Sequence, residues 1–456
     1  MTTALRRGLV VLGLVSLLAL PAFSQSEQPA GGPPDGGLGF KMGLGIGVQT
    51  FPNDPAPNTW QSLSLTPDIS FGKFGIGLDL TLDYNFSGSG NSFTVRQADW
   101  WPTTTPTFQN VLAIYLPKIA YVRWGEKGDP LYLKLGSFTD GTLGDGFIMG
   151  DYNNTLFMPA ERHFGLQADL DGTLFNFPYV GVETVFGNLA QLDVIGARVY
   201  VRPLAGTSIP IVNALQVGVT VAADTNPAYM AGGATNPFVT NPSTVAVFGI
   251  GAIAPIVSMK DVFSLAAFAD AADIQGKTWG SMAGVGGRII NIFTYTAQLR
   301  LLAGGFTPSY FGPTYDVLRG VQFNALQATD GSGTTFGGLI SLGTSLLGDA
   351  LIFKLTLDSP FVTSETDPTL SQPHVNGVLS LAPGVLPVFS FDFMYDKKGI
   401  GTFAQLVDPT NSAIQAKVNL QSGPAVISFV YDITFDATKS PAWVVTSGLQ
   451  SSISLF

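Results

Sequence analysis

Residues 74–86, FGIGLDLTLDYNF, alternate without a miss between apolar side chains and small or polar ones. Successive side chains of a β-strand point to opposite faces, so this segment predicts a strand with one apolar and one polar face. In a soluble β protein the apolar face would point into a core. In a transmembrane barrel it would face lipid, and the polar face would border a water-filled lumen. The local pattern alone does not separate these two readings.

The beginning of the chain favours export. Arg6 and Arg7 precede an apolar run over 9–20, and small residues precede a cleavage point before Gln25. A twin-arginine signal is the rival reading, but polar residues around the arginine pair are lacking, which favours ordinary export. A Pro/Gly-rich, polar stretch comes next and predicts a flexible leader. The expected organisation is a signal peptide over 1–24, a leader over 25–37 and a transmembrane barrel over 38–456.

The composition excludes several classes of protein. Asp and Glu outnumber Lys and Arg by 32 to 22, which argues against nucleic acid as a partner. The absence of cysteine excludes a disulfide scaffold and a thiolate metal site. The mean hydropathy is +0.30 and only 12% of residues are charged, yet no apolar run after the signal is long enough for a membrane-spanning helix. A closed barrel can place so much apolar surface in lipid, because every backbone polar group is paired between strands.

The alternating pattern recurs to the end of the chain and predicts no helix of any length. The number of predicted strands is odd. Single-chain bacterial barrels have even strand numbers, so at least one predicted strand must be wrong. The weakest are 179–186 and 401–407. We expect an all-β, antiparallel, up-and-down barrel of about 20 strands, with 18 or 22 as alternatives. The predicted strands are 39–49, 62–72, 74–86, 111–124, 130–138, 163–171, 179–186, 191–202, 213–223, 244–254, 261–270, 279–289, 293–303, 335–345, 350–358, 375–382, 387–395, 401–407, 413–420, 425–434 and 443–455.

The connections between predicted strands alternate in length. Those at 71–73 and 125–130 are short, whereas 87–110, 139–162, 224–243 and 304–334 are long. Outer-membrane barrels have short periplasmic turns and long extracellular loops, so this asymmetry favours a barrel over a soluble sandwich. Aromatic residues near strand ends fit interfacial belts, although ordinary strand propensity accounts for them equally well.

These features resemble the porin-like outer-membrane β-barrels of diderm bacteria over nearly all of 38–456. Within that class, LGDGFIMGDYNN and PAERHFG (143–165) and GVETVFGNLAQLDVIGARVYVRPL (181–204) resemble the poorly characterised barrels of spirochaetes and their relatives. The terminal aromatic residue, Phe456, resembles the signal read by the barrel assembly machinery, although Ser454 and Ser452 depart from the apolar positions of that signal. The resemblance implies outer-membrane lipid and the assembly machinery as partners, and brings no catalytic residues.

Charged residues fall on the files that would face the lumen. Keeping Lys and Arg off the lipid face matters, because either costs about 2 to 4 kcal/mol at the bilayer midplane of such barrels. The candidate pore-lining residues are Lys41, Asp79, Asp83, Arg123, Lys134, Asp169, Asp171, Arg198, Arg202, Arg300, Lys354 and Lys417.

The long connection over 139–162 is a candidate constriction loop. We expect it to fold into the lumen and to set acidic groups opposite a basic wall, so that solutes cross a transverse field. The alternative is a mobile outer loop. The residues proposed for the constriction are Asp140, Asp145, Asp151, Glu161 and Arg162.

The function that this pattern favours is passive diffusion of small hydrophilic solutes, with a weak preference for cations because of the net acidity. One alternative is a surface-display, adhesive or structural barrel without an open pore, and another is an uptake barrel for apolar substrates. His163 and His374 raise the question of catalysis, but neither lies in a recognisable nucleophile motif, so no enzyme is expected. The aspartates of 140–151 lack calcium-loop spacing, and no metal or cofactor is expected. Whether the barrel forms a homo-oligomer is left open.

Overall fold

The computed structural model of the chain describes residues 38–454, apart from the short segments 52–53, 55–58, 88–91, 103–105, 159–160, 210, 260–261, 291, 347–349, 361–372, 383–384, 409, 423–424 and 436–442. The predicted signal peptide, the leader and Phe456 lie outside the described residues. Within the described residues, strands predominate and the helices are short.

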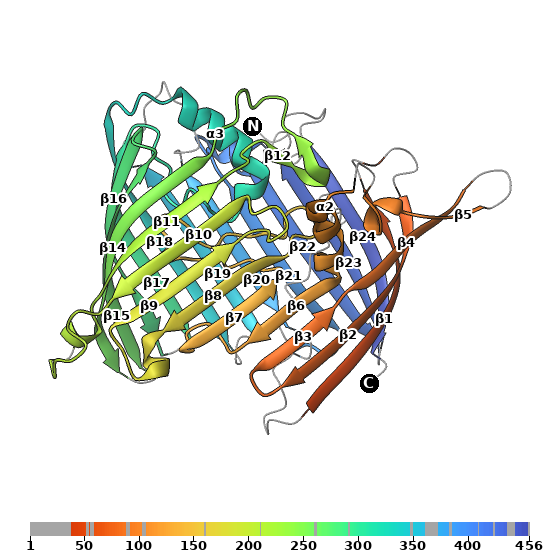
Figure 1. Cartoon of the computed structure of the whole chain (residues 1–456), viewed down its shortest axis with the longest axis horizontal. Coiled ribbons are helices and arrows are strands. Elements are labelled where there is room, and N and C mark those ends of the chain that lie inside the picture. Colours follow the sequence, from red (N-terminus) through yellow and green to blue (C-terminus); the bar gives the residue numbers. More distant parts are fainter. Residues whose placement is uncertain are drawn as a thin grey trace, which may run out of the picture.

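The strands are antiparallel and run diagonally around a barrel (Figure 1). The short strands β12 (Tyr229–Met230) and β13 (Ala234–Thr235) pair only with each other. The strands of the main sheet are β1 (Leu38–Thr50), β2 (Thr59–Phe71), β3 (Phe74–Leu78), β4 (Leu80–Ser87), β5 (Ser92–Val95), β6 (Ile119–Trp124), β7 (Leu131–Gly136), β8 (Gly165–Asp171), β9 (Val180–Phe186), β10 (Val194–Val201), β11 (Gln216–Asp224), β14 (Val245–Met259), β15 (Phe263–Ile274), β16 (Thr278–Ile289), β17 (Phe293–Ala303), β18 (Thr334–Leu346), β19 (Leu351–Pro360), β20 (His374–Leu381), β21 (Phe389–Lys397), β22 (Ser412–Ser422), β23 (Ala425–Phe435) and β24 (Trp443–Ser454).

The main sheet closes on itself. Strand β1 pairs with β2 on one side and with β24 on the other, where Gly43 lies opposite Ser454 and Gln49 opposite Gly448. Of the 22 strands in this sheet, β3 and β4 form one crossing, and β5 pairs only with β4, which leaves a closed ring of 20 crossings. The prediction of about 20 strands in an all-β antiparallel barrel is confirmed. Among the described residues, closure gives the strands of the ring a partner on both sides, whereas β5 keeps one side without a strand partner.

The interruption between β3 and β4 has a local cause. Strand β2 pairs with both segments in one continuous register, and Pro67 of β2 lies between the two paired regions. Proline has no N–H to donate to a neighbouring strand. On the other side of this crossing, the pairing of β3 with β6 shifts at Gly77 and Leu78. Residues 74–86 therefore form one bent crossing.

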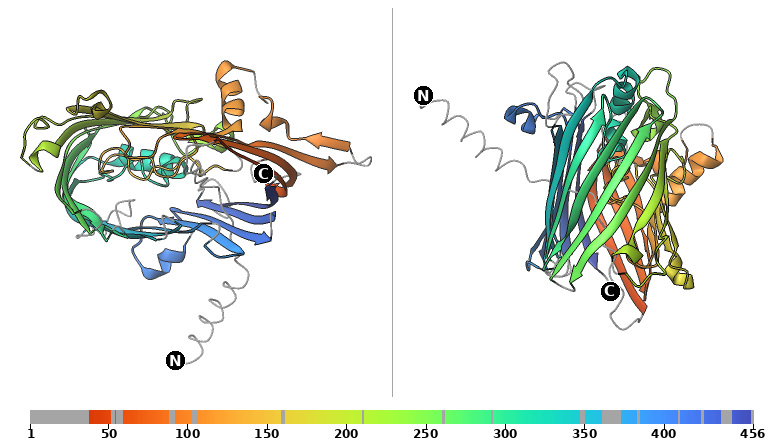
Figure 2. Two further views of the ribbon diagram at one scale, coloured as in Figure 1. Left: turned by 90° about the horizontal axis from the view of Figure 1, so that it is seen from below. Right: turned by 90° about the vertical axis from the view of Figure 1, so that its left-hand side faces the viewer.

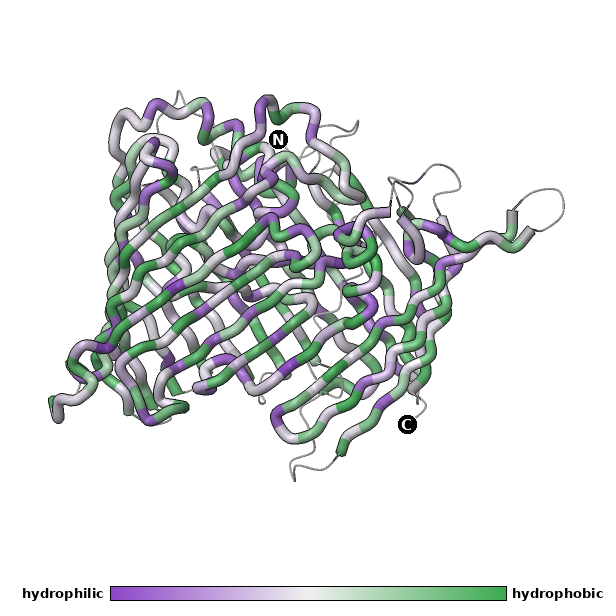
Figure 3. Tube along the Cα trace, viewed as in Figure 1, coloured by the Kyte–Doolittle hydropathy of each residue, from purple (hydrophilic) through white to green (hydrophobic). Residues whose placement is uncertain are grey.

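Along most of the strands the exposed outward side chains are apolar and the inward ones are polar, with inward-facing exceptions such as Val247 and Ile274. In β10, Arg198 and Tyr200 are buried whereas Val199 and Val201 are exposed. Elsewhere on the outer face, Ile46 is 61% exposed. Figure 3 shows the same alternation of hydrophobic and hydrophilic residues along the strands. This inversion is the expected arrangement for a barrel surrounded by lipid.

The two ends of the barrel differ in their connections. Short turns such as 72–73 and 125–130 lie at one end, together with the longer connection between β10 and β11, and most long loops lie at the other, which carries α3 (Tyr315–Ala328) and β12 (Figure 1). No helix among the described residues is both long enough and apolar enough to cross a membrane. The remaining short helices are α2 (Phe108–Tyr115), η1 (Gln97–Asp99), η2 (Leu116–Lys118), η3 (Gly172–Phe175), η4 (Val212–Ala214), η5 (Ala231–Gly233) and η6 (Phe403–Val407).

Three sequence predictions about secondary structure are wrong. The predicted strand at 401–407 is the single-turn helix η6, which is closed by a capping box between Thr402 and Gln405. The first part of 111–124 is helical, because the hydroxyl of Thr107 caps α2 by accepting a hydrogen bond from the backbone N–H of Asn110. The prediction that no helix occurs fails most clearly at α3.

Candidate functional site

Two long loops fold into the barrel instead of extending away from it. We call residues 137–158 and 161–164 inner loop A and residues 304–333, which include α3, inner loop B. Seen along the barrel, α3 and its neighbouring segments lie within an oval ring of strands (Figure 2). The two inner loops meet at a bridge between Met149 and Phe311.

Apolar packing explains why these loops fold inward. The rings of Phe147 and Phe306 stack with their centroids 5.5 Å apart, and those of Phe311 and Tyr315 lie 4.7 Å apart. Met149 is completely buried among them. Burial of apolar side chains is the main favourable contribution to such packing. The barrel thus encloses an apolar core, to which the wall contributes inward-facing side chains such as Val247 and Ile274.

Helix α3 is amphipathic, although its charged residues also face inward. Its buried residues recur with helical spacing at Tyr315, Leu318 and Arg319, Gln322 and Phe323, and Leu326. Asp316 stands in its first turn, where a carboxylate interacts favourably with the helix dipole.

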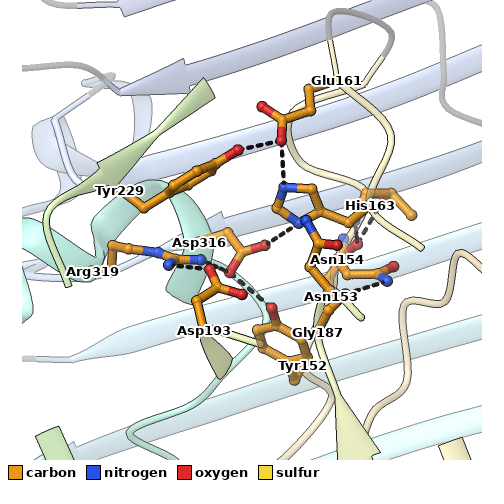
Figure 4. A network of polar contacts seen from close by, with 12 residues as sticks. Tyr152, Asn153, Asn154, Glu161, His163, Gly187, Asp193, Tyr229, Asp316 and Arg319 are labelled. Carbon is orange, nitrogen blue, oxygen red and sulfur yellow. Dashed lines mark hydrogen bonds and ion pairs between the residues drawn. The ribbon is translucent and has the colours of Figure 1, made fainter. Parts of the chain in front are cut away.

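Arg319 is the centre of a buried polar network (Figure 4). Its guanidinium donates to Asp193 at 2.6 Å and to Asp316 at 2.7 Å, and lies 3.6 Å from Asp224. The hydroxyls of Tyr152 and Tyr315 donate to Asp316 and Asp224 at 2.8 and 2.7 Å. These carboxylates raise the pKa of Arg319 further, despite its burial. The surrounding carboxylates offset the free-energy cost of removing the guanidinium charge from water.

His163 of inner loop A joins the same network. Its ring nitrogens lie 3.2 Å from a carboxylate oxygen of Glu161 and 3.3 Å from one of Asp316 (Figure 4). Burial alone would lower the pKa of His163, but the two carboxylates outweigh it and raise that pKa to about 10. The imidazolium in turn helps to lower the pKa of Asp316. At neutral pH His163 is therefore a cation that connects the two inner loops.

Inner loop A also reaches the opposite wall of the barrel. The side-chain amide of Asn153 donates to Gln415 of β22 at 3.0 Å, and the carboxylate of Asp151 forms an ion pair with Lys354 of β19. Inner loop B makes a similar contact, from Thr314 to Asp396 of β21 at 2.9 Å. The loops consequently cross the lumen from β7 and β8 to β19 and β22.

A cavity of about 250 Å³ remains between the inner loops and the wall formed by β17–β20. Cationic and anionic groups both line it. Arg300 lies 3.2 Å from Asp358, which also lies 3.4 Å from His374. The charged and amide residues of its lining are Asp145, Asp151, Gln298, Arg300, Lys354, Asp358, His374, Asn376 and Lys398.

A closed antiparallel ring, an apolar outer face and a charged lumen are thus present together. The fold is that of a porin-like outer-membrane barrel. The resemblance to spirochaete barrels is not tested by the structure and stays a prediction.

Comparison with known proteins gives no family by sequence, since no family model and no curated protein match this chain. Solved structures to which the chain is similar include a mutant porin of Rhodopseudomonas blastica, 8% identical, with 92% of this chain and 100% of that chain covered and a TM-score of 0.26. OccK5 (OpdH) of Pseudomonas aeruginosa is 8% identical, with 92% and 98% covered and a TM-score of 0.31. Wzi of Escherichia coli, described as a carbohydrate-binding β-barrel involved in capsule assembly, is 10% identical, with 91% and 84% covered and a TM-score of 0.31.

Several predicted pore-lining residues form ion pairs. Arg198 pairs with Glu183 at 2.7 Å and Arg202 with Asp171 at 2.5 Å, while Arg300 and Lys354 pair with the cavity carboxylates. Asp83, Arg123 and Lys417 are buried on the inner side of the wall, whereas Lys41 is exposed; Lys134 and Asp169 are partly buried. These positions do not test whether the residues line a conducting pore.

The predicted constriction residues divide into three groups. Asp145 and Asp151 line the cavity. Asp140 accepts from Gln167 at 2.9 Å and Arg162 pairs with Asp79 at 2.5 Å, so both lie against the wall. Glu161 lies away from the cavity, in the His163 network.

Sequence reasoning missed the residues that hold the inner loops. Asp193, Asp224, Asp316 and Arg319 were not singled out, although the helical spacing of apolar residues around Arg319 was a usable signal. Among the described residues, no group of three or more His, Asp or Glu side chains is arranged to hold a metal ion.

Proposed function

We propose that this protein is an outer-membrane channel through which small hydrophilic solutes diffuse passively, past a constriction formed by inner loop A and the β17–β20 wall. The observation that carries the proposal is the charged cavity between them. Apolar solutes gain no favourable interaction with such a lining. Small polar solutes can replace hydrogen bonds to water by interactions with its charged groups.

The arrangement of charge across this cavity supports selective passage. The carboxylates of Asp145 and Asp151 belong to the inner loop, and the cations Arg300 and Lys354 belong to the wall. Lys354 pairs directly with Asp151 and Arg300 pairs with Asp358, so a solute in the cavity meets groups of both signs side by side. Because both signs of charge are present, the constriction can discriminate between solutes by their dipoles as well as their net charge.

The alternative of a barrel without an open pore is favoured by one specific observation. The apolar core around Met149 and Phe311 ties the two inner loops together across the lumen. If this core never moves and leaves no continuous passage, the protein is a structural or display barrel. The uptake of apolar substrates is less well supported, because charged groups line the cavity.

Export and membrane insertion belong to the same proposal. We infer that the signal peptide over 1–24 directs export and that the barrel assembly machinery inserts the chain. The apolar outer face of the barrel supports insertion, because this surface requires lipid.

Recordings from the purified protein in planar bilayers test the channel. We expect a steady conductance in the wild type. Lys354→Glu should shift the reversal potential in a salt gradient toward cation selectivity, and Asp151→Lys should shift it toward anions. Lys41→Glu, at an exposed site in β1 away from the cavity, is the matched control and should shift it less. If the folded wild type shows no conductance, the closed barrel is favoured. If Lys354→Glu and Lys41→Glu shift the reversal potential equally, the cavity is not the constriction.

A further inference from the structure

Two loops turn outward at the end of the barrel that carries the long loops. The α2 loop comprises the described residues between β5 and β6, and the η6 loop those between β21 and β22; they lie outside opposite walls of the barrel (Figure 2). Both are separate from the inner loops. Neither takes part in the proposed passage.

The outward loop around α2 exposes large apolar side chains. Phe108 is 79% exposed, and Trp101 and Tyr115 are also exposed. None of the eight residues of α2, FQNVLAIY, is buried. An isolated helix of this length is marginal in water, and α2 packs on the protein only in part, with residues 110–114 half-buried and its other residues exposed.

The outward loop around η6 has the same property. Phe403 is 92% exposed and Val407 is 87% exposed. No residue of η6 is buried. A soluble protein seldom presents such side chains in fixed positions unless the surface contacts something apolar.

Hydrogen bonds hold both loops in these exposed positions. In the first loop, Gln109 of α2 donates to Gln191 at 2.8 Å, and the hydroxyl of Tyr115 donates to the backbone carbonyl of Trp100 at 2.9 Å. In the second, Tyr395 donates to the carbonyl of Leu406, and the ammonium group of Lys397 donates to the carbonyl of Asp408 at 2.8 Å. The exposure of the apolar side chains is therefore a property of folded, anchored segments.

The two surfaces continue the lipid-facing surface of the strands. Leu192, next to the residue that anchors α2, is 50% exposed, and Phe393 lies on the same outer face of β21 as Tyr395, which anchors η6. Each outward loop thus begins where the apolar outer face of the barrel ends. This is the level at which aromatic and amphipathic groups meet the lipid headgroups.

We propose that the α2 loop and the η6 loop lie in the headgroup region of the outer leaflet and insert Trp101, Phe108, Phe403 and Val407 among the parts of the acyl chains nearest the headgroups. They act as two interfacial anchors that fix the depth and tilt of the barrel. Short apolar helices lying in the plane of the interface behave in this way.

Their positions favour lipid over a second copy of the chain. Lipid surrounds a barrel on every side, so anchors outside opposite walls both contact it. Copies of a chain form a closed ring only if the rotation from one copy to the next returns to the first copy. Contact patches on opposite walls instead favour an open-ended row of copies. The test must therefore distinguish contact of the two loops with lipid from contact between copies of the chain.

The chain contains no cysteine, so a single introduced cysteine can be labelled without first removing native cysteines. We would introduce Phe108→Cys and Val407→Cys in the full chain, attach an environment-sensitive fluorophore, and fold each variant into phosphatidylcholine vesicles. Lipids that carry a quencher near the headgroup or deep in the acyl chain report the depth of the label. Ile340→Cys, on the outer face of β18, is the deep control, and Asp330→Cys, exposed in inner loop B, is the control in water.

We expect both test labels to emit at shorter wavelength than the Asp330→Cys label and to be quenched more strongly by the shallow lipid than by the deep one. The Ile340→Cys label should show the reverse preference. Labels at Trp101→Cys and Phe403→Cys provide a second pair if either first variant folds poorly. Quenching no stronger than that of the Asp330→Cys label overturns the proposal. Energy transfer between labelled copies that rises with protein density, without lipid quenching, overturns it in favour of a contact between copies.

Discussion

The guanidinium of Arg319 lies 2.6 Å from the carboxylate of Asp193, although 126 positions separate them in the chain. Asp193 belongs to the turn before β10, at the rim of the barrel wall, whereas Arg319 belongs to a helix inside the lumen. The contact fixes inner loop B to the wall. Through Asp316 and His163 the same network fixes inner loop A as well, so the two loops are held as one unit.

Replacing the arginine should release this unit. In Arg319→Met, Asp193, Asp224 and Asp316 remain buried near one another without their cation, and breaking a buried pair in this way costs roughly 3 to 5 kcal/mol. We expect the free energy of unfolding in urea to fall by that order, and the single-channel current to become larger or noisier. Arg288→Met, at an exposed position in β16, is the control. An unchanged current and stability in Arg319→Met would show that the network does not hold the loops.

His163 makes the stability of the inner loops depend on pH. Because the pKa of His163 is raised from 6.5 to about 10, its ion pairs contribute fully below about pH 6.5 and are lost as the pH rises toward 10. We expect His163→Gln to lower stability most at pH 6 and progressively less up to pH 10, measured by urea unfolding of both proteins in the same lipid. A difference between the two proteins that stays constant over this range would contradict a charged His163.

The orientation of the strands can be tested at two neighbouring residues of β18. Ile340 faces outward and is 58% exposed, whereas Ser341 lines the cavity. Ile340→Arg should cost about 2 to 4 kcal/mol if it lies near the bilayer midplane, because it places a charge in lipid. Ser341→Arg should cost less and should instead alter conductance. Comparison of urea-dependent folding into vesicles measures both, and equal costs would contradict the assignment of the two faces.

The apolar core inside the barrel provides a further test. Phe306 packs against Phe147 and lies close to Gly280 of β16, where an added Cβ would be 2.5 Å from its ring. We expect Phe306→Ala to cost roughly 3 to 5 kcal/mol, as for other buried phenylalanines. Phe306→Leu should retain part of that free energy. Protease sensitivity of the inner loops in intact vesicles is the second measurement, and no increase for Phe306→Ala would show that this core does not hold them.

The strands could be predicted because their signal is local. Alternation such as that of 74–86 depends only on neighbouring residues, and removing the wrong prediction at 401–407 leaves the 20 crossings that the structure contains. The inward placement of Arg198 and Arg300 followed from the same alternation. Two helices were missed because their apolar residues are continuous or widely spaced, a pattern that does not distinguish a strand, an outward loop and a segment packed inside the barrel.

The candidate site could be predicted only in part. Asp145 and Asp151 were identified as loop carboxylates, and the structure places both at the cavity. The partners that hold the loops could not be identified, since Asp193, Asp224 and Arg319 come together only after several hairpins have formed. Contacts between residues so far apart leave no periodic trace in a single sequence.

By itself, the sequence determined the two faces of the strands, because a period of two residues assigns each strand position to one face; the hydropathy and the alternating loop lengths then favoured a barrel with the apolar face outside. Only the tertiary structure decided which long loops enter the lumen and which turn outward. That choice depends on whether a loop finds its apolar and charged partners on the inner wall, on another loop or beyond the outer rim, and those partners lie up to hundreds of residues away in the chain.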